Sequence, residues 1–106
     1  MSVAAPELTA DARAAALRKA TSVRMARRKF KDSVAAGEIP LGLAIERAKG
    51  NEALAGIRVR DLLQCVRGIG PARAEALMEE LGIARSRRVR GLGYRQTAGI
   101  LRKVKR

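Results

Sequence analysis

Residues 67–70 have the sequence Arg-Gly-Ile-Gly, and Pro71 follows directly. Proline suits the first position of a helix, where its missing N–H group would have no partner. Glycine lacks Cβ, so it reaches positive φ and lets another molecule approach the backbone closely. Free N–H groups at a helix start bind anions, and the flanking arginines favour phosphate. The candidate residues of this site are Arg67, Gly68, Ile69, Gly70 and Arg73, with Ile69 also expected to anchor the turn in the core.

A second basic segment, the basic run, covers residues 85–93 with the sequence Arg-Ser-Arg-Arg-Val-Arg-Gly-Leu-Gly. Residues 85–106 contain nine Lys or Arg residues and no acidic residue. Val89 and Leu92 are apolar, and we expect them to hold the run against the core. A final helix is expected to begin after Gly93, and its N-terminal end is a second anion site. The candidate nucleic-acid contacts of the run are Ser86, Arg87, Arg88, Arg90, Gly91 and Gly93.

A third group of cations lies at residues 24–31, which contain five Lys or Arg residues in eight positions. A solvated helix face is an equally good interpretation of such a group, and the second basic segment adds weight to a binding role. Arg28 and Lys31 are the candidate contacts here. The glycines at 68 and 70 also have a simpler interpretation, because many helix–helix turns contain glycine and bind nothing.

The chain has 106 residues, a formal net charge of +13 and an isoelectric point of about 11.5. This balance predicts a polyanionic partner, either nucleic acid or an acidic membrane surface. No stretch approaches the roughly 18 consecutive apolar residues of a membrane span. The N-terminus lacks the basic segment of a secretory signal. We therefore expect a cytoplasmic protein that binds nucleic acid and not a membrane.

The residue types that are missing also bear on function. The sequence contains no histidine, one cysteine and no cluster of carboxylates, so it predicts no metal site, no cofactor and no catalytic centre. Cys65 lies among apolar residues, and we expect a buried structural thiol. Phe30 and Tyr94 are the only aromatic residues. Proteins that bind single strands stack bases on several aromatic rings, so the composition favours recognition of a nucleic-acid backbone.

The elements that position these residues are all expected to be helices. Residues 1–8 look unordered, and a helix of roughly 25 residues is expected from Thr9 or Asp11 to Ala36, ended by Gly37. Its first half is rich in alanine and should project as an arm, whereas Val23 to Val34 should dock on the body. We divide the chain into an N-terminal helical arm, 1–36, and a helical domain, 37–106.

Within that domain, a second helix is expected with Pro40 in its first turn and its end at Lys49. Asn51 is expected to cap a single turn at 52–55. Residues 57–60 should form a link, not a sheet. The two helices of the hairpin should then begin at Asp61 and Pro71, the second ending at Gly82. The last helix should run from Tyr94 to about Val104, with Ile100, Leu101 and Val104 facing the core.

The hairpin at 66–70, the Gly-Ile pair at 82–83 and the sequence at 87–93 together resemble the actinobacterial-type integration host factor, over nearly the whole chain. The resemblance implies an all-α monomer with a helix-hairpin-helix or helix-two-turns-helix unit. It also implies binding of duplex DNA in the nucleoid, DNA bending or compaction, and support of phage integration beside a phage integrase. One departure is Arg67, where proline is common in such hairpins. A ribosomal protein with the same domain shares the hairpin but less of the basic run.

Three functions from different classes remain. The first is an architectural DNA-binding protein, and the second is a ribosomal or other RNA-binding protein. The third, a base-excision glycosylase, is the weakest, because the chain is too short and too poor in aromatic residues to hold a flipped base. No side chain stands out as a reader of bases. Because phosphate contacts carry no sequence information, little sequence specificity is expected.

Overall fold

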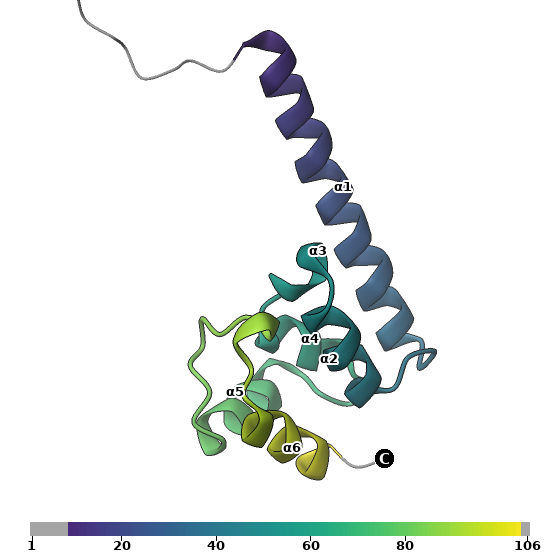
Figure 1. The fold of residues 1–106 in the computed structure, drawn as a ribbon. Coiled ribbons are helices and arrows are strands. Elements are labelled where there is room, and N and C mark those ends of the chain that lie inside the picture. The colour runs from purple at the N-terminus through teal and green to yellow at the C-terminus, as the bar shows by residue number, and fades with distance from the viewer. Residues whose placement is uncertain (1–8, 105–106) are drawn as a thin grey trace, which may run out of the picture.

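The computed structural model describes residues 9–104, and regular structure in this range is entirely helical, as expected (Figure 1). The elements in chain order are α1 (Ala10–Ala35), α2 (Leu41–Lys49), α3 (Glu52–Ala55), α4 (Val59–Cys65), α5 (Pro71–Glu80), the 3₁₀ helix η1 (Val89–Gly91) and α6 (Tyr94–Lys103). The prediction about residues 1–8 lies outside this range. None of the helices in residues 9–104 is long and apolar enough to cross a membrane.

Helix α1 starts where the sequence predicts a cap, because the Thr9 side chain accepts a hydrogen bond from the backbone N–H of Ala12. It ends before Gly37, whose φ of +78° is readily adopted only by glycine. Phe30 and Val34 are buried in the second half, whereas Leu17 in the first half is 68% exposed. The first half of α1 therefore projects from the body, as expected (Figure 1).

The core of the body is formed by the apolar faces of the helices. Its most deeply buried large side chains are Ile45, Val59, Leu62, Leu63, Met78, Val89 and Ile100. Helix α2 packs against α3, η1 and α6, and α4 packs against α5 and the docked half of α1. The short turn α3 begins at Asn51, whose side chain accepts from the N–H groups of Ala53 and Leu54. This cap was predicted from the sequence.

Three local predictions were wrong. Helix α4 begins at Val59 and not at Asp61, because residues 57–59 are already held in place by the basic run. The N–H of Val59 donates to the carbonyl oxygen of Arg87 over 3.0 Å, and the N–H of Val89 donates to that of Ile57 over 2.9 Å. Pro40 is the N-cap of α2 and not its first residue.

The third wrong prediction concerns α6, where Leu101 is 38% exposed although it was expected to face the core. Ile100 is the fully buried residue of this helix. Since successive residues are turned by about 100° around a helix, Leu101 leaves the buried face. Its side chain lies at the edge of the body, over Gly42 of α2.

Candidate nucleic-acid interface

The hairpin between α4 and α5 is a tight turn held by backbone hydrogen bonds. The N–H of Val66 donates to Leu63 O, and the N–H of Ile69 donates to Val66 O, both over 3.0 Å. Ile69 is only 4% exposed, which confirms it as the anchor of the turn. The two glycines have different roles, because φ is +92° at Gly68 but −89° at Gly70.

The open side of the turn faces solvent. A Cβ atom added at Gly70 would meet no atom within 4 Å. Pro71 is the first residue of α5, as predicted, and no side chain caps this helix start. The first N–H of α5 to find a backbone partner is that of Ala74, which donates to Gly70 O. Within residues 9–104, the N–H groups of Ala72 and Arg73 therefore lack such a partner and remain available to an anion.

The basic run is an ordered segment, because Val89 is fully buried and Leu92 is 3% exposed. Its cations are positioned by carbonyl oxygens. The guanidinium of Arg87 donates to Gly91 O over 2.9 Å, and that of Arg88 donates to Gly56 O. Neither side chain is among the ion pairs found in residues 9–104. Their charge is therefore not neutralised by a carboxylate.

Two cations from outside the run join it. Arg27 of α1 donates from Nε to Ala53 O over 2.7 Å, and a Cβ atom on Gly56 would collide with its guanidinium. The Arg90 guanidinium approaches the same point, so Arg27, Arg88 and Arg90 converge around Gly56. We call these three residues the arginine cluster. Lys49 of α2 donates to Leu92 O over 2.8 Å and so adds another cation beside the run.

Arg27, Lys49 and Gly56 are not among the contacts predicted from the sequence. The spacing of apolar residues in α1 nevertheless indicated the position of Arg27. Arg27 follows Val23 by four residues and precedes Val34 by seven. This spacing places Arg27 on the docking face of α1. Arg28, which the sequence predicted as a contact, is the next residue and lies on a different face of α1. It lines a shallow surface groove with Met25 and Asp32. The structure does not bring Arg28 to the arginine cluster.

Lys31 lies near the free thiol of Cys65 on α4. Burial raises the pKa of this thiol above its usual value, and the nearby Lys31 ammonium partly opposes that increase. The Cys65 thiol donates to the carbonyl oxygen of Asp61 over 3.2 Å. A half-buried thiol with a raised pKa is a poor nucleophile, which agrees with the structural role expected for Cys65.

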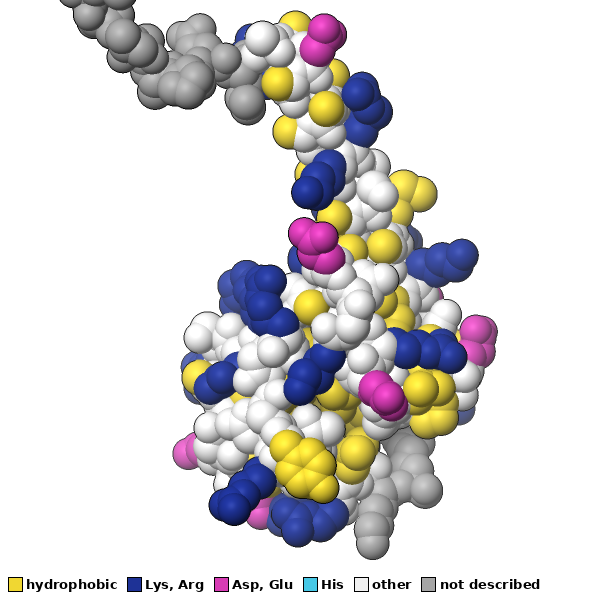
Figure 2. Space-filling model, viewed as in Figure 1, with side chains coloured by type: hydrophobic (Ala, Val, Ile, Leu, Met, Phe, Trp, Pro, Cys, Tyr) yellow, Lys and Arg dark blue, Asp and Glu magenta, His cyan; other side chains and the backbone are white. Residues whose placement is uncertain are grey.

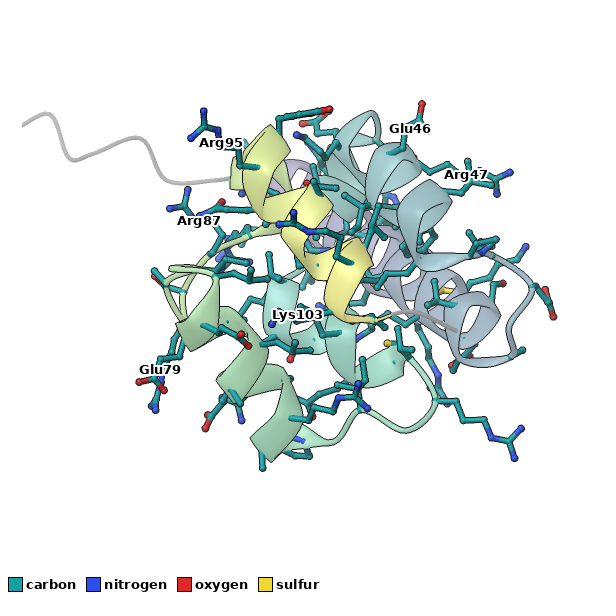
Figure 3. The ribbon with its side chains drawn as sticks, turned by 90° about the horizontal axis from the view of Figure 1, so that it is seen from below. Glu46, Arg47, Glu79, Arg87, Arg95 and Lys103 are labelled. Carbon is teal, nitrogen blue, oxygen red and sulfur yellow. The ribbon has the colours of Figure 1, made fainter. Side chains whose placement is uncertain are left out.

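The hairpin and the basic run occupy different sides of the domain. In Figures 1 and 3, the loop between α4 and α5 lies on the side of the body opposite the loop that leads from α5 to η1. In Figure 3, Arg87 and Arg95, the second residue of α6, project from the same side of the body. The remaining candidates on this side, Ser86, Gly91 and Gly93, are all exposed. Figure 2 shows Lys and Arg side chains spread over the visible face of the body, with several acidic side chains between them.

Comparisons with known proteins agree with this geometry. Residues 34–104 match the S13-like H2TH domain family. The chain is 41% identical to the integration host factor of Mycobacterium tuberculosis, over 95% of this chain and 96% of that protein. It is 40% identical to that of Streptomyces coelicolor, over 94% of each. A solved structure described as sIHF bound to an 8bp palindromic DNA matches with a TM-score of 0.80 and 35% identity, over 83% of this chain and 99% of that chain. A helix-two-turns-helix body, a projecting first helix and this degree of identity together show that the chain belongs to the integration host factor family of actinobacteria.

Proposed function

We propose that this protein is an architectural DNA-binding protein, which grips the phosphates of duplex DNA with little sequence specificity and bends or compacts the duplex. The arginine cluster is the observation that supports this proposal most directly. Like charges normally separate on a protein surface, yet three guanidinium groups converge around Gly56. A phosphate group between them removes that repulsion and completes their hydrogen bonding.

The carbonyl contacts explain how the basic run binds efficiently. A free arginine side chain loses much of its conformational freedom when it contacts a ligand. Arg87 and Arg88 are already held by Gly91 O and Gly56 O, so part of this entropy is lost during folding. Each guanidinium has five N–H groups, and the donors not used by a carbonyl remain available to phosphate.

The two anion sites explain why DNA should be deformed. The hairpin loop between α4 and α5 and the loop that leads from α5 to η1, which carries the first part of the basic run, lie on opposite sides of the domain (Figures 1 and 3). One duplex that contacts both sites must curve around the body, and two duplexes that each contact one site are drawn together. The first arrangement bends DNA and the second compacts it. Neither needs a base-specific contact, because phosphates carry the affinity.

Duplex DNA is favoured over RNA because the solved relative is bound to DNA and the curated relatives are integration host factors. We propose further that the protein acts in the nucleoid as a monomer and supports a phage integrase at recombination sites. This role requires no catalytic group. Within residues 9–104, no three His, Cys, Asp or Glu side chains are grouped to hold a metal ion.

Titration of labelled duplex DNA and duplex RNA of equal length, over a range of salt concentrations, tests the proposal. Contact with about six phosphates predicts a slope of log K against log [salt] near −5 for DNA. We expect tighter binding of DNA at every salt concentration. A slope shallower than about −2, or preferential binding of the RNA duplex, would contradict the proposal.

A further inference from the structure

Tyr94 is exposed at the start of α6, directly after the basic run. Its side chain is 87% exposed, whereas Phe30, the only other aromatic residue, is buried. A single exposed apolar side chain is common on protein surfaces. The surroundings of Tyr94 are less common, because Arg95 follows it, Arg87 and Arg95 project from the same side of the body (Figure 3), and the sequence from 82 to 106 contains no acidic residue.

The backbone that carries Tyr94 is held firmly. The N–H of Gly93 donates to the Gln96 side chain, and the Thr97 hydroxyl donates to Gly93 O, each over 3.1 Å. One residue earlier, Leu92 is buried and its carbonyl oxygen accepts from Lys49. Since tyrosine has only two side-chain torsions, its ring is presented at low entropic cost. Tyr94 is therefore an exposed apolar side chain on a well-held backbone, between the basic run and Arg95 in sequence.

We propose that Tyr94 contacts the bases of duplex DNA as an apolar wedge, while the surrounding arginines contact phosphates. The inference rests on the proposed function and extends it from backbone contacts to the base pairs. Architectural proteins commonly insert an apolar side chain at a base step, which partly unstacks it and kinks the duplex. Tyr94 would therefore contribute to the bend and to the part of the affinity that does not depend on salt.

An apolar surface for a protein partner is the competing explanation of this exposure. Leu101 lies two turns further along α6 and is also partly exposed, but its side chain packs over Gly42. It is therefore already covered in part by α2. The ring of Tyr94 has no comparable cover, because it is 87% exposed, and in sequence it lies between the basic run and Arg95. This environment complements a polyanion better than it complements an average protein surface.

The intrinsic fluorescence of the protein provides a direct test, because the sequence contains one tyrosine and no tryptophan. All tyrosine emission therefore comes from Tyr94. After correction for absorption by DNA, we expect duplex DNA to quench this emission strongly, since the ring stacks on bases. Heparin binds the same cations but has no bases. We therefore expect that most of the Tyr94 emission remains unquenched when heparin binds. Equal quenching by both polyanions would contradict the inference.

Matched variants test the same inference by affinity and bending. Tyr94→Ala should weaken DNA binding about fivefold or more and reduce the bend measured by energy transfer between the ends of a labelled duplex. The salt slope should stay unchanged, because no phosphate contact is lost. Tyr94→Phe should restore both properties, since a ring without its hydroxyl still inserts. Leu17→Ala, which removes an apolar side chain exposed on the arm, should behave like the unmodified protein.

The outcomes separate this inference from the proposed function. Duplex binding with a steep salt slope but with unquenched Tyr94 emission would overturn the wedge and leave the architectural role in place. Normal affinity and bending by Tyr94→Ala would also overturn the wedge and leave the architectural role in place. Loss of binding by Tyr94→Phe would overturn the wedge as well, because it would indicate a contact between the Tyr94 hydroxyl and a phosphate. Failure of the unmodified protein to bind duplex DNA would overturn both.

Discussion

The guanidinium of Arg88 donates a hydrogen bond to the carbonyl oxygen of Gly56, across 32 positions of the chain. The same two segments also share the backbone hydrogen bonds between residues 57–59 and 87–89. Arg88 is half-buried, whereas its neighbour in the arginine cluster, Arg90, is exposed. We therefore expect Arg88 to contribute to both stability and DNA binding, and Arg90 to contribute to DNA binding alone.

Arg88→Ala should lower both the stability and the DNA affinity of the protein. It leaves the Gly56 carbonyl without its charged partner, which costs about 1–3 kcal/mol of unfolding free energy. Arg90→Ala should reduce DNA affinity with no change in stability. Urea unfolding followed by circular dichroism, together with DNA titration, distinguishes the two variants. Equal stability of both would show that the bond to Gly56 O contributes nothing to folding.

The basic run should contribute more to binding than an equal number of cations in the arm. Loss of two phosphate contacts in Arg87→Ala with Arg90→Ala should make the salt slope shallower by about 2. The control is Arg13→Ala with Arg18→Ala, two exposed cations in the projecting half of α1. This pair removes the same charge and should leave the slope nearly unchanged. An equal change in both double variants would assign the main contacts to the arm.

Cys65 should react slowly with alkylating reagents in the folded protein. Burial raises the pKa of its thiol above the usual value of 9.0, so less thiolate is present at pH 8 than in the unfolded chain. The rate with iodoacetamide should therefore rise when the protein is unfolded in guanidinium chloride. By linkage, the contribution of this thiol to stability is constant below about pH 9 and decreases above it. Lys31→Gln should slow the reaction further, because the Lys31 charge lowers this pKa.

Much of the fold was predictable because its signals are local. Thr9 and Asn51 accept hydrogen bonds from the helices they precede, and Gly37 and Gly82 both have positive φ just after a helix. The candidate residues of the hairpin and of the run are adjacent in sequence. Short-range rules of capping and turn chemistry are sufficient to locate them.

The rest depends on pairing between distant segments, which no local pattern specifies. The sequence around Gly56 does not indicate that its carbonyl oxygen accepts a hydrogen bond from Arg88. Helix α4 starts at Val59 because the Val59 N–H donates to the carbonyl oxygen of Arg87. Arg27 is an intermediate case. Its position on the docking face of α1 follows from helical spacing, but its carbonyl partner, Ala53, becomes apparent only when α1 and α3 are brought together.

Gly68→Ala should destabilise the protein. The φ of +92° at Gly68 is one that an alanine rarely adopts, and such strain costs about 1–3 kcal/mol. Loss of DNA binding by this variant would be difficult to assign, because the turn itself is altered. Thermal unfolding should show a lower Tm than that of the unmodified protein. An unchanged Tm would mean that the turn relaxes to another conformation without cost.

Gly70→Ala is the sharper test of the hairpin as a phosphate site. Its φ of −89° suits any residue, and an added Cβ atom would meet open space, so the Tm should stay unchanged. A phosphate bound at the N–H groups of α5 would collide with that methyl group, and DNA affinity should fall about tenfold, which corresponds to about 1.4 kcal/mol. Gly50→Ala is the matched control, since Gly50 has a φ of −87° and leaves ordinary van der Waals space for Cβ at the end of α2. Full DNA binding by a stable Gly70→Ala protein would show that the turn only connects α4 to α5, and it would leave the basic run and the arginine cluster as the whole interface.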